Sequence, residues 1–230
     1  MLDIIYQDES LVVCVKPFRV ISTDEPGGMP DQIRETLGQP NAKVRAVHRL
    51  DQVVGGLMVY GLTGPAASDL SRQIREDRFA KEYQAVVHWR PQYDEGTFID
   101  LLGRNEKTRK TYVTKTPAKG VQQAILHYRL LDNRQGFSLV KIRLETGRTH
   151  QIRAQFSSRG MPLAGDRKYS KYPDPKDWQI ALWSSHLSFT HPETGEAMDF
   201  RLPPPKTAPW TLFQDADGET NESEPTNQDA

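Results

Sequence analysis

Short apolar runs separated by polar turns dominate the chain and predict a fold built mainly of strands. In the run at 137–145, Val140, Ile142 and Leu144 alternate with charged residues, which is typical of a strand with one buried face. Seven other runs have the length and residue types of strands: 4–6, 11–15, 57–62, 83–89, 124–131, 181–189 and 198–202. Because most of these runs follow one another as hairpins would, we expect one α+β domain on a largely antiparallel sheet.

Three stretches have helical rather than strand spacing. A short amphipathic helix is predicted over 31–37, and a longer surface helix begins near Pro65. In the third stretch Ile152 and Phe156 share one face, and Gly160 is placed to end the helix. We expect these helices to flank the sheet.

The end of the chain has a different composition from the rest. Three consecutive prolines at 203–205 cannot continue a strand, so they indicate the end of the fold. Residues 214–230 hold no large apolar side chain and cannot bury enough surface to offset their ordering entropy. No Lys or Arg follows Lys206, whereas six residues after it are acidic: Asp215, Asp217, Glu219, Glu222, Glu224 and Asp229. We therefore expect a folded domain at 1–206 and a disordered acidic tail at 207–230.

Charge and cysteine content narrow the class of protein. Of 230 residues, 30 are basic and 30 acidic, so the chain without its six tail acids is modestly basic. The single cysteine, Cys14, excludes an internal disulfide, and its apolar neighbours favour a core position over a reactive thiol. No apolar run approaches the length of a membrane span, and the start of the chain is acidic where a signal peptide is basic. We expect a protein of the reducing cytoplasm.

Two stretches carry residues suited to chemistry. In AVHRLDQVVGGLMVY, residues 46–60, one acid, Asp51, lies between a basic segment and a Gly-Gly pair that precedes a strand. A lone Asp in a loop is most often a turn-former or cap. In LETGRTHQIRAQFSSRG, residues 144–160, two arginines and a histidine gather at a predicted helix start. The unpaired N–H groups and partial positive charge of such a helix start suit a phosphate or a carboxylate.

Together these stretches resemble the pseudouridine synthases of the RluA type. The resemblance is carried by HRLD followed by a Gly-Leu pair, and by TGRTHQIR. VVCVKP at 12–17 is similar to the family's N-terminal strand, and KEYQAVV at 81–87 is similar to its tyrosine-bearing strand. The resemblance extends over about residues 11–205. It implies a single catalytic domain without the N-terminal S4-like RNA-binding domain that some members have. One departure concerns Val54-Gly55, where the family has Thr-Ser hydroxyls that brace the loop of the acid.

The resemblance implies roles for four residues. Asp51 would be the catalytic acid group, which attacks C1′ of the target uridine or assists cleavage of the glycosidic bond in another way. Arg153 would pair with this carboxylate and keep it ionised in a dry pocket. Tyr83 would stack on the target uracil and move a proton, and Arg49 would occupy the space that the flipped nucleotide leaves in the RNA.

The partner implied by the resemblance is RNA, with a stem-loop of ribosomal or transfer RNA as the expected target. The basic stretch 96–119 is then interpreted as a flexible loop and hairpin over RNA. His48 and His150 are expected to orient loops by hydrogen bonds. No obligate protein partner is implied, and we expect a monomer. Three further residues are candidates for phosphate contacts: Lys16, Arg148 and Arg167.

No cofactor is indicated, because the sequence contains no Cys/His cluster for zinc, no P-loop and no GxGxxG after a strand. Two alternatives remain open at this point. A glycoside hydrolase would need a second carboxylate across the bond from Asp51, with Glu145 or Asp166 as candidates. A catalytically weakened RNA-binding protein of the same fold is the other alternative, because of the altered Val54-Gly55 segment.

Overall fold

The computed structural model describes residues 2–213, so the disorder expected for residues 214–230 lies outside the described part of the chain. The described residues form three α-helices: α1 (Met29–Thr36), α2 (Gly64–Arg75) and α3 (Gln151–Ser158). They also form eleven strands: β1 (Ile4–Gln7), β2 (Leu11–Lys16), β3 (Arg45–Ala46), β4 (Gly55–Gly61), β5 (Ala80–His88), β6 (Glu95–Asn105), β7 (Lys110–Thr114), β8 (Gln122–Arg134), β9 (Phe137–Leu144), β10 (Leu182–Thr190) and β11 (Ala197–Arg201).

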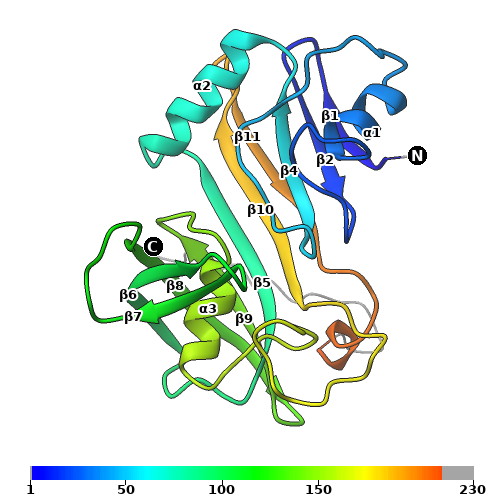
Figure 1. Ribbon diagram of the computed structural model, residues 1–230. Helices are drawn as coiled ribbons and strands as arrows, with labels where there is room; N and C mark the ends of the chain where they lie inside the picture. Colours follow the sequence, from blue (N-terminus) through cyan, green and yellow to red (C-terminus); the bar gives the residue numbers. More distant parts are fainter. Residues whose placement is uncertain (1, 214–230) are drawn as a thin grey trace, which may run out of the picture.

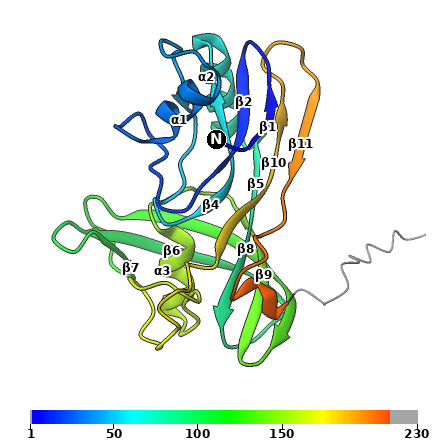
Figure 2. The ribbon, with the colours of Figure 1, turned by 90° about the vertical axis from the view of Figure 1, so that its right-hand side faces the viewer.

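All eleven strands belong to one sheet with the path β1-β2-β4-β10-β5-β9-β8-β6-β7, from which β3 pairs with β4 and β11 with β10. Among the described residues every pairing is antiparallel except that of β4 with β10. The expected α+β domain on a largely antiparallel sheet is therefore confirmed. Figures 1 and 2 show that β1, β2, β4 and β11 lie in one half of the molecule and β6 to β9 in the other, with the long strand β5 running into both.

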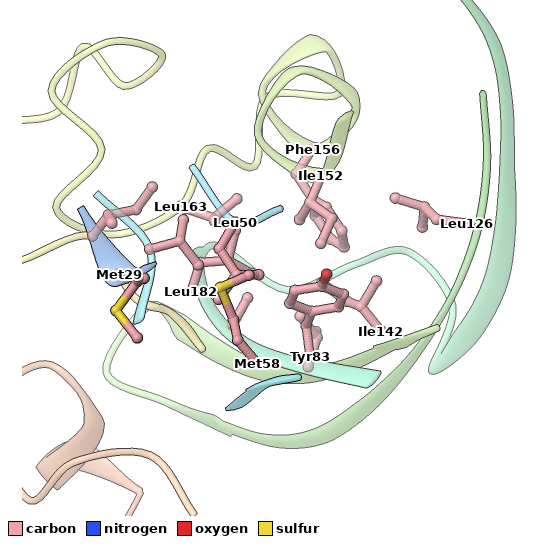
Figure 3. Close-up of a cluster of buried hydrophobic side chains, with 14 of the residues drawn as sticks. Met29, Leu50, Met58, Tyr83, Leu126, Ile142, Ile152, Phe156, Leu163 and Leu182 are labelled. Carbon is pink, nitrogen blue, oxygen red and sulfur yellow. The ribbon is translucent and has the colours of Figure 1, made fainter. Parts of the chain in front are cut away.

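The core lies on both faces of the sheet, which explains why β4 is apolar without interruption. Met58 and Tyr60 point to the face covered by α1 and α3, whereas Leu57 and Val59 point to the face covered by α2. On the α3 face, Ile152 and other apolar side chains of α3 pack against β5, β8 and β9 (Figure 3). Side chains alternate along a strand, so a strand buried on both faces needs an apolar residue at every position.

The packed part of the chain extends beyond residue 206. A short 3-10 helix, η1 (Trp210–Leu212), follows the three prolines, and Trp210 is buried in a cluster with Val86 and Ala181. The indole of Trp210 provides apolar surface that the fold can bury, whereas the acidic sequence after Phe213 has no such side chain.

The hairpin predicted within the basic stretch 96–119 is present, and it is part of the sheet rather than a flexible loop. Strands β6 and β7 form a hairpin in continuous antiparallel register from Leu101–Thr114 to Asn105–Lys110. The hairpin continues the sheet past β8, so backbone hydrogen bonds fix the positions from which its basic side chains extend.

Candidate active site

A cleft of about 1010 Å³ opens between the two halves of the sheet. Its lining includes the loop of Asp51, Tyr83 from β5, and the segment from Leu144 to Arg153 that leads from β9 into α3. The fold thus brings together Asp51 and Arg153, which are 102 positions apart in the chain. The three residues that the resemblance assigns to the reaction all line this one cleft.

Asp51 is held in a tight turn between the core and the start of β4. Leu50, which precedes it, is buried, and its backbone N–H and carbonyl both bond the hydroxyl of Ser22, at 3.1 and 2.9 Å. The N–H of Val54 donates to the carbonyl of Asp51 at 2.9 Å and closes the turn. The backbone around the carboxylate is therefore fixed on both sides of it.

Lys16 braces this turn from within the protein instead of contacting phosphate. Its ammonium is fully buried and donates to three carbonyl oxygens, those of Pro17, Gln52 and Val54, at 2.9, 3.1 and 2.7 Å. Burial lowers the pKa of Lys16 to about 8, although the charge of Asp51 acts in the opposite direction. The phosphate role expected from sequence is wrong, because all three ammonium donors are used inside the fold.

Close packing, rather than hydroxyl hydrogen bonds, determines the conformation at the Val54-Gly55 segment. A Cβ on Gly55 would lie 2.6 Å from the indole of Trp183, so this aromatic ring occupies the place of a side chain. Gly56 has φ +115°, and a Cβ there would lie 2.4 Å from the carbonyl oxygen of Ser184 on β10. The loop is thus braced by Lys16 and by close packing on β10, which removes the reason for expecting a weakened site.

Arg153 lies in the first turn of α3 and binds two carboxylates at once. Its Nη1 donates to Oδ2 of Asp51 at 2.9 Å, and its Nε and Nη2 donate to the two oxygens of Asp166, both at 2.8 Å. Burial opposes the charge of Arg153, but the hydrogen bonds and charges of Asp166 and Asp51 outweigh it and raise the pKa of Arg153. The guanidinium therefore stays protonated although it is only 4% exposed.

His150 orients the entry to α3, as expected from sequence. It adopts the left-handed backbone conformation with φ 54° immediately before the helix. Its Nδ1 bonds the hydroxyl of Tyr169 at 2.8 Å, and its Nε2 lies 3.7 Å from Oδ2 of Asp51. Burial and the charge of Arg153 lower the pKa of His150 against the opposite effect of Asp51, so the ring is neutral at pH 7.

His48 has a similar orienting role on the other side of the cleft. Its Nε2 accepts the backbone N–H of Val59 at 3.2 Å, which places the ring proton of the neutral form on Nδ1. Burial, with a smaller contribution from Lys81, lowers the pKa of His48 to about 3. His48 therefore stays neutral and ties the Asp51 loop to β4.

Tyr83 lies under the cleft with its ring in the core. The ring lies between Met58 and Ile142, and its hydroxyl is directed toward the side of α3 (Figure 3). The side chain is only 6% exposed. Burial, and secondly the charge of Asp51, raise the pKa of Tyr83, so the phenol remains protonated at neutral pH.

Arginines surround the opening of the cleft. Arg49 and Arg104 are exposed. The guanidinium of Arg148 donates through Nε to the carbonyl of Gln123 at 3.0 Å. Arg167 is not part of this lining, because its guanidinium donates to the carbonyl oxygens of Asp174 and Pro175 and so binds its own loop. Of the phosphate candidates predicted from sequence, Arg148 alone lies in position at the cleft.

The two carboxylates that a glycoside hydrolase could use are each paired with another side chain. Both oxygens of Asp166 bind Arg153, and its side chain is 1% exposed. Glu145 pairs with His127 at 2.5 Å on β8. A hydrolase needs one carboxylate on each side of the sugar bond, so this geometry does not support it.

The family model described as RNA pseudouridylate synthase matches residues 10–158. The chain belongs to this family, which confirms the resemblance based on HRLD and TGRTHQIR and makes it an isomerase of the RNA pseudouridine synthase class. The chain is 34% identical over 214 residues to YlyB of Bacillus subtilis (strain 168), an uncharacterized RNA pseudouridine synthase, covering 89% of this chain and 70% of YlyB.

Other relatives agree with this assignment. Ribosomal large subunit pseudouridine synthase D of Neisseria meningitidis serogroup B is 34% identical over 224 residues, with 89% of this chain and 58% of that protein covered. The chain thus spans little more than half the length of that relative. The solved structure of Human RNA Pseudouridylate Synthase Domain Containing 1 has a TM-score of 0.78 at 22% identity, covering 92% of this chain and 86% of that one, which confirms the fold.

Residues 2–213 contain neither a metal-binding cluster nor a membrane-spanning helix. No group of three or more His, Cys, Asp or Glu side chains in this range is arranged to hold a metal ion. No helix in this range is long and apolar enough to cross a membrane.

Proposed function

We propose that this chain converts specific uridines of ribosomal or transfer RNA to pseudouridine, with Asp51 as the catalytic acid group. The observation that carries the proposal is the ion pair between Asp51 and Arg153 at 2.9 Å beside Tyr83. Uridine and pseudouridine are isomers, so the reaction needs no donor or acceptor. It does need a group that acts on C1′ while the uracil is detached, turned and rejoined through C5, and a carboxylate is suited to this work.

The surroundings of Asp51 suit a flipped nucleotide. Its carboxylate is 22% exposed, whereas the partner Arg153 is 5% exposed, so the acid faces the cleft with its counter-ion behind it. At the opening, Arg49 can occupy the space that the flipped nucleotide leaves, and Arg148 can contact a phosphate beside the target. The name of the Neisseria relative makes large-subunit ribosomal RNA the first target to test.

The test is to map pseudouridine in ribosomal and transfer RNA from cells that lack the protein and from cells complemented with variants. Discrete positions should lose pseudouridine in the deletion strain, regain it with the wild-type chain, and stay unmodified with Asp51→Asn. Asp31→Asn, on the exposed side of α1, is the matched control and should restore modification. Unchanged maps in the deletion strain would refute the activity, and restoration by Asp51→Asn would refute the role of Asp51.

A further inference from the structure

A second buried carboxylate, Asp166, binds the guanidinium of Arg153 more extensively than Asp51 does. Two N–H groups of Arg153 donate to the two oxygens of Asp166, whereas one donates to Asp51. We propose that Asp166 is a positioning residue for the reaction. It fixes the orientation of Arg153, and it neutralises the positive charge of Arg153 while Asp51 loses its negative charge. This inference rests on the proposed function.

The two carboxylates differ in their access to solvent. The side chains of Asp166 and Arg153 are 1% and 5% exposed, whereas that of Asp51 is 22% exposed. Planar two-point pairing of a guanidinium with a carboxylate fixes both groups in orientation. The inner pair of Arg153 with Asp166 is therefore dry and constant, and the outer bond to Asp51 is the one that substrate can replace.

Charge balance explains why a second carboxylate is useful. In the free enzyme, Asp51, Arg153 and Asp166 together carry one negative charge. If Asp51 attacks, its oxygen supplies the electron pair of the new bond to C1′, the bond from C1′ to N1 breaks, and that pair leaves with the uracil. Asp51 is then uncharged and Arg153 remains neutralised by Asp166. If Asp51 accepts a proton instead, the same balance holds. Without Asp166, either step would leave an unpaired buried cation.

The position of Asp166 is fixed by the turn that carries it. Its Oδ1 also accepts the backbone N–H groups of Lys168 and Tyr169, at 3.0 and 3.2 Å. The preceding Gly165 has φ +73°, and a Cβ there would lie 2.2 Å from the carbonyl oxygen of Gln179. Its N–H donates to the carboxylate of Asp174 at 2.8 Å. The turn therefore has little freedom to follow Arg153 if the pair is broken.

The same helix offers a matched control for this pair. Arg159, near the end of α3, binds both oxygens of Asp100, at 2.9 and 3.2 Å. Neither residue lines the cleft. Asp100→Asn and Asp166→Asn thus make the same chemical change in the same type of ion pair, and only one of the two pairs reaches Asp51.

The first experiment measures single-turnover rates on an RNA substrate identified by the mapping above, across pH. Asp166→Asn should lower the rate about 10- to 100-fold, with RNA affinity within about twofold of wild type. Its rate–pH profile should move to lower pH, because the variant removes one negative charge from beside the site. Asp100→Asn should change neither rate nor profile. An Asp166→Asn enzyme with the wild-type rate, or one that is slower with an unmoved pH profile, would overturn the inference.

The second experiment needs no RNA and compares melting temperatures in a double-mutant cycle. In the wild-type background Asp166→Asn should lower the melting temperature, because Arg153 loses its partner. In an Arg153→Met background, Asp166→Asn should raise the melting temperature, because without this substitution Asp51 and Asp166 lie near each other with no cation between them. Arg153→Gln, which also removes the charge, replaces Arg153→Met if the latter does not fold. Equal losses in both backgrounds would overturn the pairing, whereas absent turnover in wild-type enzyme would count against the proposed function alone.

Discussion

The cleft contains two groups of polar residues that differ in how they are held. The floor residues, Asp51, Tyr83 and Arg153, are fixed by the core or by buried ion pairs. The rim residues are Arg49, which is exposed, and Arg148, which is half-buried; among the described contacts their guanidinium groups bind no carboxylate. The floor residues can therefore control the reaction itself, whereas the rim residues can supply the attraction for a polyanion.

This difference has a measurable consequence in salt. Charges in a buried environment are screened little, whereas exposed charges more than about 10 Å apart are largely screened at 0.1 M ionic strength. Substitutions at the floor should therefore lower turnover equally at all salt concentrations. Substitutions at the rim should lower RNA affinity, mainly at low salt, and leave turnover of the bound RNA unchanged.

The largest effect is expected at the floor, for Asp51→Asn. The amide keeps the shape of the side chain but cannot act as a nucleophile, so the single-turnover rate should fall at least 10⁴-fold, about 5.5 kcal/mol of barrier. Folding and RNA affinity should be nearly intact. Asp31→Asn is the control, and residual turnover within tenfold of wild type would exclude Asp51 as the catalytic group.

The next effect is on stability and concerns Lys16, beneath the floor. Lys16→Met removes the donor from three carbonyl groups, of which that of Val54 is buried. An unsatisfied buried group costs about 1–3 kcal/mol, so unfolding in urea should show a loss of that size. Lys43→Met, at an exposed position, should change stability little. A variant as stable as wild type would show that the ammonium does not brace the loop.

Comparison of wild type with Lys16→Met also tests how folding stability depends on pH. Burial lowers the pKa of Lys16 to about 8 from its ordinary value of 10.5. Between these values the unfolded chain binds the proton more than the folded one, so folding stability contributed by this group rises with pH. Wild type should therefore gain stability relative to Lys16→Met from pH 8 to pH 10.5, measured by urea unfolding. A constant difference would contradict the lowered pKa.

The third effect separates two roles of Tyr83. If the hydroxyl moves a proton, Tyr83→Phe should lower single-turnover rates about 100-fold, the low end for a positioned acid or base, because burial keeps the phenol protonated. Tyr83→Leu should lose stacking as well, which contributes about 1–3 kcal/mol per base in single-strand binders. A Phe variant close to wild type beside an inactive Leu variant would show that the ring acts by stacking alone.

A smaller effect is expected at the rim, for Arg148→Ala. RNA affinity should fall several-fold at low salt, and the slope of log affinity against log salt should decrease by about one. Turnover at saturating RNA should not change. Arg201→Ala, an exposed arginine outside the cleft, is the control. A loss of turnover that is independent of salt would show that Arg148 acts in the reaction, as the floor residues do.

The smallest effect is expected for removal of residues 214–230. These residues carry six acids and no base, so they compete with phosphate for the rim residues. Their removal should leave the melting temperature unchanged and strengthen RNA binding by no more than about twofold at low salt, measured by filter binding. A large drop in melting temperature would show that this segment is part of the folded domain.

Sequence patterns predicted most of the helices and strands, and the family resemblance predicted the floor residues. Neither predicted the contacts that hold the floor residues in place. Alternation along 137–145 predicts β9, and helical spacing from Pro65 predicts α2, because both depend on neighbours in the chain. The pairing of Asp51 with Arg153 across 102 positions followed from the family resemblance and not from any local pattern.

Lys16 and Asp166 were misplaced or missed because their roles depend on burial that long-range packing creates. Lys16 has the pattern of a solvated strand end and becomes buried only because β2 lies beside β4 in the sheet. Asp166 lies in a short polar turn, where a carboxylate is usually a cap. The preceding Gly165 indicates a turn, but its left-handed conformation and its close approach to Gln179 are visible only in the structure.

The place of β10 in the sheet has a consequence for synthesis on the ribosome. Strand β10 is inserted between β4 and β5, yet it begins at Leu182, about a hundred residues after both of them. A nascent chain that ends before β10 contains Asp51, Tyr83 and Arg153 but has no strand to join the two halves of the sheet. Non-local pairing of this kind forms late and slowly. The arrangement of Asp51, Tyr83 and Arg153 around the cleft is therefore expected to form only after β10 has been synthesised, so a shorter nascent chain should not act on RNA.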